Sequence, residues 1–565
     1  MTLSSILLPS LAHYERRWLP KDVVAGLVLS ALLVPQGMAY AELAGLPPVT
    51  GLYTSILCLI GYALVGPSRI LVLGPDSSLG PMIAATLLPL LGANGDPVRA
   101  VALASALAIM TGVLMVAAGA GGLGFVADLL SKPTILGYMN GLALTILVGQ
   151  LPKLLGFSVD ADNFLGDVAG VVSGIVKGEV VPAAALIGAF SLVLIVVMDR
   201  LLPRIPAVLV TVVVAMIISL ALSLDAKGVK LVGPLAQGLP SFAIPSVSLN
   251  DVTLLVVGAF GIALVALADT ISTASSFAAR QGAEINGNRE MIGIGTANIA
   301  AGFFQGFPVS TSGSRTAVAE KAGARSQLTG LVGALMIGLM LVAFPNLLAS
   351  LPQPTLAAVV IAASISLADI PATRRLFAQR KADFWLSITA FLSVVLFGVL
   401  AGIVIAIALS VGNVFRRIWW PYRTELGKVE GIAGVHDLTE HPDAHRLDRC
   451  PIYRFDGPLI FANASTFRDD ILRLAASKPA WIIVASEPIT DVDTTACDML
   501  EGLVRKLDEL DVRLVFAEMK SPTRRKLDRY GLEHVIDDSR FFPTNRVATE
   551  AYIEVSGAAW RSPST

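Results

Sequence analysis

Long apolar segments alternate with short polar connections along residues 1–423 of this 565-residue chain. A first set lies at residues 23–44, 51–66, 75–91, 99–120, 134–151, 182–199 and 205–223. A second set lies at residues 252–277, 291–304, 312–324, 328–349, 355–368, 384–400 and 401–415. A helix that crosses a membrane needs about 17–25 apolar residues. The pattern therefore predicts a polytopic α-helical membrane protein with about 14 spans in two sets of seven.

The charged residues confirm that the chain changes character near residue 424. They make up about 10% of residues 1–423 but about 30% of residues 424–565, against about 25% in an ordinary soluble chain. In the second part, apolar strand candidates at 452–461, 481–486 and 512–518 alternate with helical spacing at 465–476 and 495–510. This order predicts a small α/β domain after the membrane domain, and it excludes a wholly soluble enzyme.

Lysine and arginine are distributed unequally between the two sides of the predicted membrane domain. With 14 spans, 18 of its 24 Lys and Arg residues fall on the side shared by both termini, and the long loops 152–181 and 224–251 fall on the other side. Positive loops stay in the cytoplasm, so we expect a multi-pass protein of the cytoplasmic (inner) membrane with both termini cytoplasmic. The predicted parts are an N-terminal segment (1–21), a transmembrane domain (22–418, with repeats of about 22–223 and 252–418), a linker (419–430), a soluble domain (431–556) and a tail (557–565).

Two segments, each the third in its half, are interrupted by glycine, proline and small hydroxyl residues. The residues of interest in the first segment are Gly74, Pro75, Ser77 and Ser78, and those in the second are Ser310, Thr311, Ser312 and Ser314. Interrupted segments at matching positions of two halves are typical of transporter binding sites. The other interpretation is a pair of re-entrant loops that bind no ligand.

Arg315 lies inside the second interrupted segment, at the start of a short apolar helix. A guanidinium at this depth costs at least about 2.5–3.5 kcal/mol and is usually functional or paired. Helix starts attract anions through free N–H groups and the helix dipole. The residue therefore favours an anion site, and the alternative is a structural ion pair with Asp269 or Asp76.

Two carboxylates and one amide complete the candidate site. Asp269 lies in the middle of an apolar segment, where a carboxylate carries a proton, binds Na⁺ or neutralises a cation such as Arg315. Asp76 follows Pro75 at a helix start, where aspartate is an ordinary cap; close to an anion it would be a second coupling residue. Gln36, directly after Pro35, is uncharged and a candidate for lining the site.

Several other motifs do not carry a function. The glycine-rich run at residues 119–124 joins two predicted spans and lacks the strand–helix context of a dinucleotide site. His436, His441 and His445 lie in a solvated stretch before the first tail strand, and three cysteines make neither a disulfide framework nor a metal site. No basic patch with interleaved aromatic residues suggests nucleic acid. We expect no enzyme activity, no cofactor and no metal.

Several motifs in the chain resemble those of one transporter family. The residues are 35–41 (PQGMAYA), 45–48 (GLPP), 51–53 (GLY), 66–69 (GPSR), Gly74-Pro75 and the stretch from Asn298 through Gly306 to Ser310. They resemble the SulP sulfate-permease family, which comprises bacterial and plant relatives of the solute-carrier-26 anion transporters. The tail is similar to the STAS domain of that family, so the resemblance covers nearly the whole chain.

The resemblance implies seven-plus-seven inverted repeats divided into core and gate domains, and a homodimer. It places the anion between Gly74–Ser78 and Ser310–Arg315, beside the Ser314-Arg315 pair, and makes Asp269 the residue of cation coupling. Asp76 departs from the small or apolar residue common in the family. In the tail, Thr494 and Thr495 match a turn in which a hydroxyl, at the position of Thr495, is phosphorylated in related anti-sigma-factor antagonists. For a transporter tail, an ordinary helix cap is the preferred interpretation.

These features together predict a secondary active inorganic-anion transporter that takes up sulfate with protons by alternating access. The same fold would also serve bicarbonate with Na⁺, a dicarboxylate or chloride. A protein of a different class, a membrane sensor that signals through its STAS tail, is the other alternative.

Overall fold

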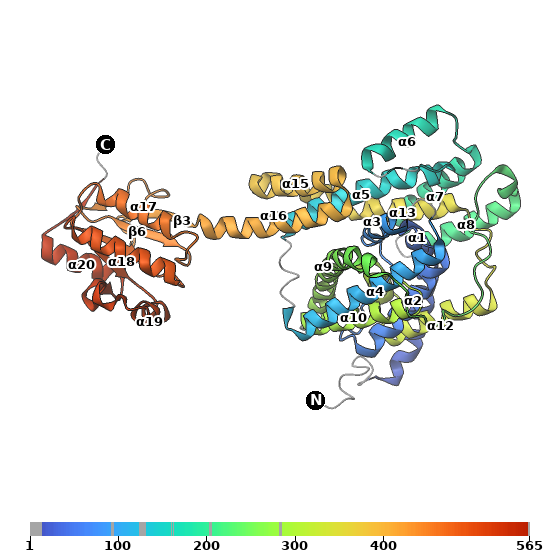
Figure 1. Ribbon diagram of the computed structural model, residues 1–565, viewed down its shortest axis with the longest axis horizontal. Helices are drawn as coiled ribbons and strands as arrows, with labels where there is room; N and C mark the ends of the chain where they lie inside the picture. The colour runs from blue at the N-terminus through green and yellow to red at the C-terminus, as the bar shows by residue number, and fades with distance from the viewer. Residues whose placement is uncertain are drawn as a thin grey trace. The chain divides into compact units, whose positions relative to one another are not determined.

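The computed structural model describes residues 14–91, 95–123, 131–159, 161, 163–202, 206–281 and 285–562. The chain forms two compact units, Met1–Ser410 and Val411–Thr565, which Figure 1 draws in the colours of chain order. The first unit is helical, and the second contains a mixed β-sheet.

The first half of the helical unit begins with a short 3₁₀ turn (Arg16–Trp18). A second 3₁₀ turn (Asp225–Lys227) follows the last helix of this half. Its helices are α1 (Leu19–Leu43), α2 (Pro48–Val65), α3 (Gly80–Leu91), α4 (Pro97–Ala120), α5 (Lys132–Leu155), α6 (Phe164–Val176), α7 (Pro182–Leu201) and α8 (Ala207–Leu222). Proline occupies the first turn of several of them, where its missing N–H group costs nothing.

The second half repeats this order. Its helices are α9 (Leu249–Gln281), α10 (Gly287–Phe303), α11 (Gly313–Lys321), α12 (Leu328–Ala343), α13 (Gln353–Leu367), α14 (Ile370–Gln379), α15 (Lys381–Phe397) and α16 (Val399–Trp419). Among the described residues, eight helices are long and apolar enough to cross a membrane by length and composition, and shorter apolar helices accompany them. The predicted polytopic helical membrane protein is confirmed.

Two helices lie in regions that were expected to be loops. Helix α6 occupies the middle of the predicted loop 152–181, and α14 lies between the spans predicted at 355–368 and 384–400. Each of these two helices follows the fifth predicted segment of its half, so α6 and α14 occupy corresponding positions in the two halves. The match supports an internal duplication of the whole eight-helix order.

The helices of this unit pack in two groups. Helices α1, α2, α4, α9, α10 and α12 make extensive contacts with one another, whereas α5, α7, α13 and α15 form a second set. Glycines allow the closest approaches: a Cβ atom on Gly137 of α5 would lie 1.9 Å from the carbonyl oxygen of Ser387 on α15. This division is the core-and-gate arrangement that the family resemblance implies.

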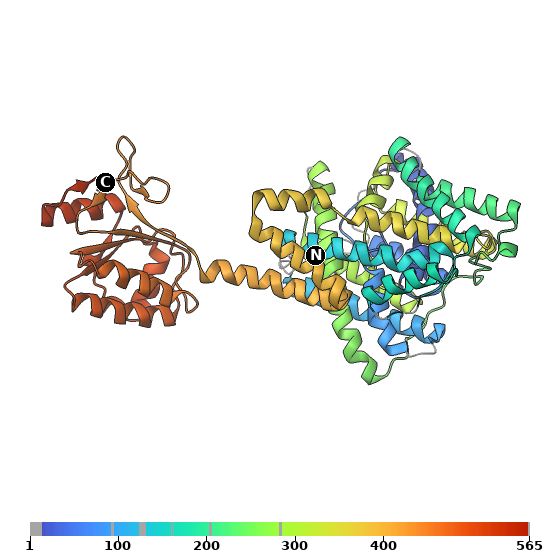
Figure 2. The same ribbon diagram turned by 90° about the horizontal axis from the view of Figure 1, so that it is seen from above.

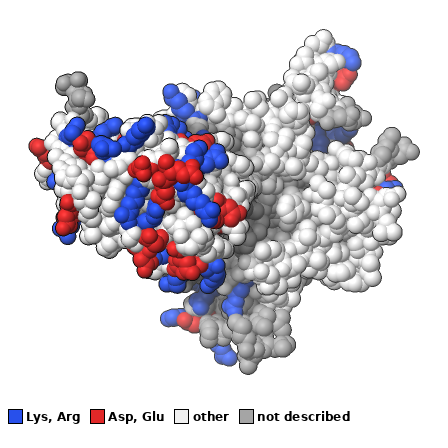
Figure 3. Space-filling model, turned by 60° about the vertical axis from the view of Figure 1, so that its left-hand side comes forward, with Lys and Arg blue, Asp and Glu red and all other residues white. Residues whose placement is uncertain are grey.

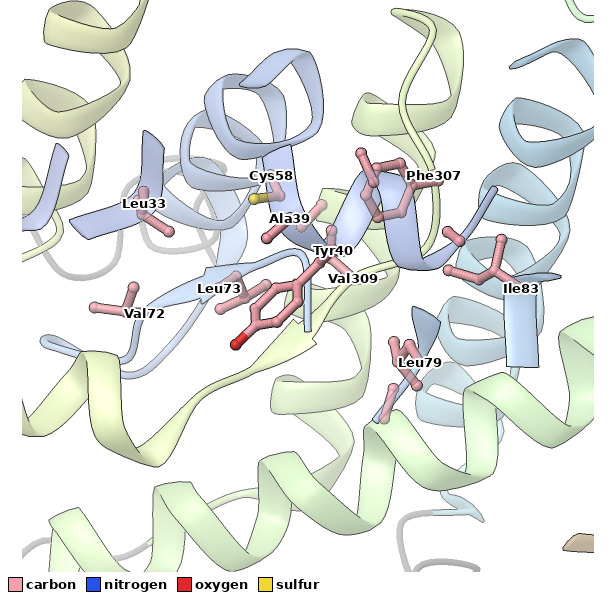
Figure 4. Packing of buried hydrophobic residues seen from close by; sticks show 14 of the residues in the cluster. Leu33, Ala39, Tyr40, Cys58, Val72, Leu73, Leu79, Ile83, Phe307 and Val309 are labelled. Atoms are coloured by element: carbon pink, nitrogen blue, oxygen red, sulfur yellow. The ribbon is translucent and has the colours of Figure 1, made fainter. Parts of the chain in front are cut away.

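One short strand from each half meets in the interior of the unit. Strand β1 (Leu73–Gly74) pairs antiparallel with β2 (Ser310–Thr311), so that Leu73 faces Thr311 and Gly74 faces Ser310. Figure 4 shows the two strands among the apolar side chains of Leu33, Leu73 and Val309. The interrupted segments of the two halves are therefore joined to each other by backbone hydrogen bonds.

The second unit is built on a six-stranded sheet. Its strand order is β4 (His436–Asp437), β3 (Tyr422–Gly427), β6 (Ile452–Asp456), β7 (Trp481–Ala485), β8 (Arg513–Ala517) and β9 (Phe541–Phe542). The pairs β6–β7, β7–β8 and β8–β9 are parallel, and β3 is antiparallel to both its neighbours. A separate pair joins β5 (Arg446–Leu447) to β10 (Trp560–Arg561).

Helices cover both faces of this sheet (Figure 2). One face packs on α17 (Ala464–Ala475) and α18 (Thr494–Asp508), and the other face packs on α20 (Asn545–Ser556). Strand β8 is followed by α19 (Ser521–Arg529) and by two short 3₁₀ turns (Leu532–His534 and Asp538–Arg540). In the face drawn in Figure 3, basic and acidic side chains alternate over this unit, whereas the helical unit is mostly uncharged. Strand β3 falls within residues 419–430, where a linker is predicted, so the sheet begins before residue 431.

A buried carboxylate connects the two halves of the helical unit. Asp22, in the first turn of α1, accepts hydrogen bonds from the N–H groups of Arg325 (2.6 Å) and Ser326 (3.2 Å). It also accepts from the hydroxyls of Ser326 (2.8 Å) and Thr329 (3.0 Å). These donors belong to the turn that leads into α12 and to its first turn, so Asp22 ties the start of α1 to the start of a helix of the other half.

We expect Asp22→Ala to lower the thermal unfolding temperature of the detergent-purified protein. The change leaves buried donors without an acceptor, and each such group costs about 1–3 kcal/mol. Asp96→Ala is the control, because Asp96 caps α4 through the N–H of Val98 at an exposed position, where loss of a cap costs about 1 kcal/mol. Equal unfolding temperatures for the two variants would contradict the structural role of Asp22.

Candidate functional site

The paired strands place two helix starts next to each other. After β1, the chain turns at Pro75 and Asp76, and the Asp76 carboxylate accepts from the N–H of Ser78 (3.0 Å), which sets the turn into α3. After β2, the Ser312 hydroxyl accepts from the N–H of Arg315 (3.4 Å) and caps α11. Both helices thus begin inside the unit rather than at its surface.

Buried side chains hold the strand ends in place. Asn298 of α10 accepts from the N–H of Val309 (2.9 Å) and donates to its carbonyl oxygen (3.2 Å). Thr316 accepts from the N–H of Val72 (3.1 Å), and the Gln327 amide donates to two carbonyl oxygens of the chain that leads into β1. Buried backbone groups need such partners, so these residues fix the geometry of the two helix starts.

Arg315 is 1% exposed and connects α11 to the turn after β1. Its guanidinium donates to the carbonyl oxygens of Pro75 (2.5 Å) and Gly74 (3.4 Å) and lies 3.3 Å from a carboxylate oxygen of Asp76. Its Nε has no acceptor among the described residues. The structure therefore brings Arg315 to the predicted site, with Asp76 and not Asp269 as its ion-pair partner.

A single serine links the two carboxylates of the site. The Ser78 hydroxyl contacts Asp76 (2.8 Å) and also donates to Asp269 of α9 (3.1 Å). Thr270, the next residue of α9, accepts from the Thr311 hydroxyl of β2 (3.2 Å). Helix α9 therefore contacts the starts of both half-helices through adjacent residues.

A cavity of about 1480 Å³ opens in front of the helix starts. Seven of the predicted site residues line it, namely Gln36, Asp76, Ser77, Asp269, Thr311, Ser312 and Ser314. The remaining five do not line it and lie behind the wall, namely Gly74, Pro75, Ser78, Ser310 and Arg315. Hydroxyl groups, one amide and the two carboxylates, rather than the guanidinium itself, therefore line the open space.

The cavity also has lining residues that the sequence did not indicate. Tyr40 lies one turn after Gln36 on α1, and Thr273 lies one turn after Asp269 on α9. Residues four apart share a helix face, so this spacing is the signal that could have found them. Gly313, between the two serines that were singled out, completes the α11 side.

At its other end the cavity reaches residues where several helices begin or end. Val24 belongs to the first turns of α1, Asp199 to the last turn of α7, and Lys321 is the last residue of α11. Leu367 ends α13 at the same rim. The space thus extends from the middle of the unit toward one of its ends.

In the tail, Thr494 and Thr495 are both exposed at the start of α18. Asp493 accepts from the N–H groups of Ala496 (2.8 Å) and Phe461 (2.8 Å) and is an ordinary helix cap. Nearby, a hydrogen bond from Lys526 holds the pKa of Asp491 below its usual range. Among the described residues, no group of three or more His, Cys, Asp or Glu side chains is placed to hold a metal ion.

An inverted arrangement of two half-helix starts, a cavity reaching one end and a separate α/β tail define a membrane transporter of the inverted-repeat class. Residues 19–390 match the model of the sulfate permease family, and residues 441–548 match that of the STAS domain. The chain belongs to the sulfate permease family, which is a family of transporters and not of enzymes.

Several relatives match nearly the whole of this chain. A probable sulfate transporter of Mycobacterium tuberculosis is 39% identical over 96% of each chain. Sulfate transporter 1.3 of Arabidopsis thaliana is 28% identical over 95% of this chain and 85% of its own. Among solved structures, the murine Solute Carrier 26 family member A9 anion transporter in the inward-facing state has a TM-score of 0.88 at 23% identity, over 97% of this chain and 94% of that chain. This likeness confirms the fold of both units.

Proposed function

We propose that this protein is a secondary active anion transporter that takes up sulfate together with protons across the cytoplasmic membrane. The observation that carries the proposal is the pair of helix starts joined by β1 and β2, with the buried Arg315 behind them and a cavity in front. Two relatives that match nearly the whole of this chain are named sulfate transporters, and they support the choice of sulfate.

The anion is proposed to bind against Ser77, Thr311, Ser312 and Ser314. Hydroxyl groups donate hydrogen bonds that replace part of its water, and the dipoles of α3 and α11 both point their positive ends at it. Gln36 and Tyr40 face the same space from α1. No metal or cofactor is needed for this mode of binding.

Arg315 is proposed to supply the positive charge from behind the wall. It does not line the cavity, so it acts through its field and through the turn that it holds. A unit charge 4 Å from another contributes about 4 kcal/mol at the effective dielectric constant typical of proteins. An interaction energy of this size is enough to select anions, while the hydrogen bonds to the anion come from neutral groups.

The cavity is proposed to open to the cytoplasm, because Lys321 at its rim belongs to the side that carries most Lys and Arg residues. Both termini then lie in the cytoplasm. Movement of the α1–α4 and α9–α12 group against the other helices would open the site to the outside. Asp269, which lines the cavity beside the anion site, is proposed to take up the coupling proton. The family resemblance adds a homodimer to this proposal.

Labelled sulfate uptake into proteoliposomes tests the substrate and the coupling ion together. We expect uphill uptake with an inward proton gradient and none with an inward Na⁺ gradient. Asp269→Asn should weaken the uphill component, because the amide cannot carry a proton. Absence of sulfate uptake by folded protein under every gradient would exclude this cargo, and bicarbonate, a dicarboxylate and chloride would be tested next. Absence of flux of every anion would favour the membrane sensor.

Replacement of Arg315 tests the site itself. We expect Arg315→Ala to lower sulfate uptake about 100-fold, because it leaves two carbonyl oxygens and the Asp76 carboxylate without their buried cation. Arg315→Lys should retain more activity, since it keeps the charge but not the planar fork.

The matched control is Arg99→Ala. Arg99 forms an ion pair with Asp251 at 3.5 Å, but its side chain is 52% exposed and lies outside the cavity lining. Uptake by this variant should stay close to that of the wild type. Near-normal uptake by Arg315→Ala protein, at equal membrane expression, would refute the proposed anion site.

A further inference from the structure

The charges of the three ionisable side chains at the site do not sum to zero. Arg315 contributes one positive charge, whereas Asp76 and Asp269 contribute two negative charges when both are ionised. The site as a whole then carries one net negative charge. A divalent anion placed between the helix starts would meet net repulsion, since like charges at short range in a low-dielectric site repel strongly.

No other described side chain in the surroundings supplies the missing positive charge. Helix α1 presents Gln36 and Tyr40, α2 presents Cys58 toward Arg315, and α5 presents Tyr138 toward Asp269. All four are uncharged at neutral pH. Lys321 and Asp199 lie at the far rim of the cavity and oppose each other in sign. Protonation of the two carboxylates would therefore remove the negative charge that opposes a divalent anion at the site.

Asp76 is well placed to compete with the anion. It holds the Arg315 guanidinium through one carboxylate oxygen (3.3 Å) and the Ser78 hydroxyl through the other (2.8 Å). Unlike Arg315, it lines the cavity, and its side chain is 15% exposed. Asp76 thus occupies one N–H group of the guanidinium and compensates the positive charge that an incoming anion needs.

We propose that Asp76 is a second proton-carrying residue, so that two protons accompany each divalent anion and transport is electroneutral. This inference rests on the proposed function and adds its stoichiometry. From the outside, water delivers one proton to Asp76 and one to Asp269. Neutral Asp76 no longer compensates Arg315, whose charge then attracts the anion. On the inside both protons leave, Asp76 pairs with Arg315 again, and the anion is repelled into the cavity.

The sulfate gradient that the protein can sustain tests this stoichiometry. Proteoliposomes are clamped at zero membrane potential with a pH difference of about one unit, and the internal-to-external sulfate ratio is measured when net flux stops. Two protons predict a limiting ratio of about 100-fold, and one proton predicts about tenfold. We expect about 100-fold for the wild type and about tenfold for Asp76→Asn, which then becomes sensitive to membrane potential.

Asp167→Asn is the matched control, because Asp167 lies in the first turn of α6 and outside the cavity lining. It should keep the wild-type ratio. A wild-type ratio of about tenfold, or an unchanged ratio in Asp76→Asn, would overturn the inference and leave proton-coupled uptake standing. No proton-driven uptake by the wild type would instead refute the proposed function.

Proton uptake on binding gives a measurement that does not depend on flux. Sulfate is added to detergent-purified protein in weakly buffered solution, near the pH at which both carboxylates are ionised in the empty site, and the protons absorbed per bound sulfate are counted. We expect about two for the wild type and about one for Asp76→Asn. Asparagine mimics protonated aspartate in shape and charge, so the variant must still bind sulfate. Loss of sulfate binding by folded Asp76→Asn protein would overturn the inference.

Discussion

The antiparallel contact between β1 and β2 is the constraint on which the rest of the site depends. In the interior of a membrane protein, backbone groups that leave a helix must find partners within the protein. Strands Leu73–Gly74 and Ser310–Thr311 satisfy this requirement with each other. Because each half of the chain supplies one strand, neither half-helix start is complete alone. The site therefore forms only when the two halves fold against each other.

The same constraint explains the position of Arg315. The turn after β1 leaves the carbonyl oxygens of Gly74 and Pro75 pointing at one place, and a guanidinium is the side chain whose planar fork serves several acceptors there. A Cβ atom on Gly74 would lie 2.9 Å from this guanidinium, so any larger residue there would displace the guanidinium from its acceptors. Arg315, which holds this turn in place, thus also supplies a positive charge behind the wall of the cavity.

The sequence predicted the architecture well because interruptions by glycine and proline are visible at fixed places in two apolar sets. The sequence did not separate residues that face the cavity from those behind it. Adjacent serines such as Ser77 and Ser78 look alike in the sequence, and only the conformation of the turn places one at the cavity and the other behind it. Helix α14 was missed because Arg374 and Arg375 make an amphipathic helix look like a polar loop. Strand β3 was missed because its polar residues gain their pattern only from pairing with β6.

Two aspartates, Asp22 of α1 and Asp269 of α9, differ in how many hydrogen bonds their carboxylates accept and in their exposure. Asp22 is fully buried and accepts four hydrogen bonds from the residues that lead into α12 and begin it. Asp269 accepts one, from Ser78, among the described residues, and it lines the cavity. The chain therefore places its fully hydrogen-bonded aspartate where the two halves are joined and its less hydrogen-bonded one at the wall of the cavity, and the coupling role is proposed for the second.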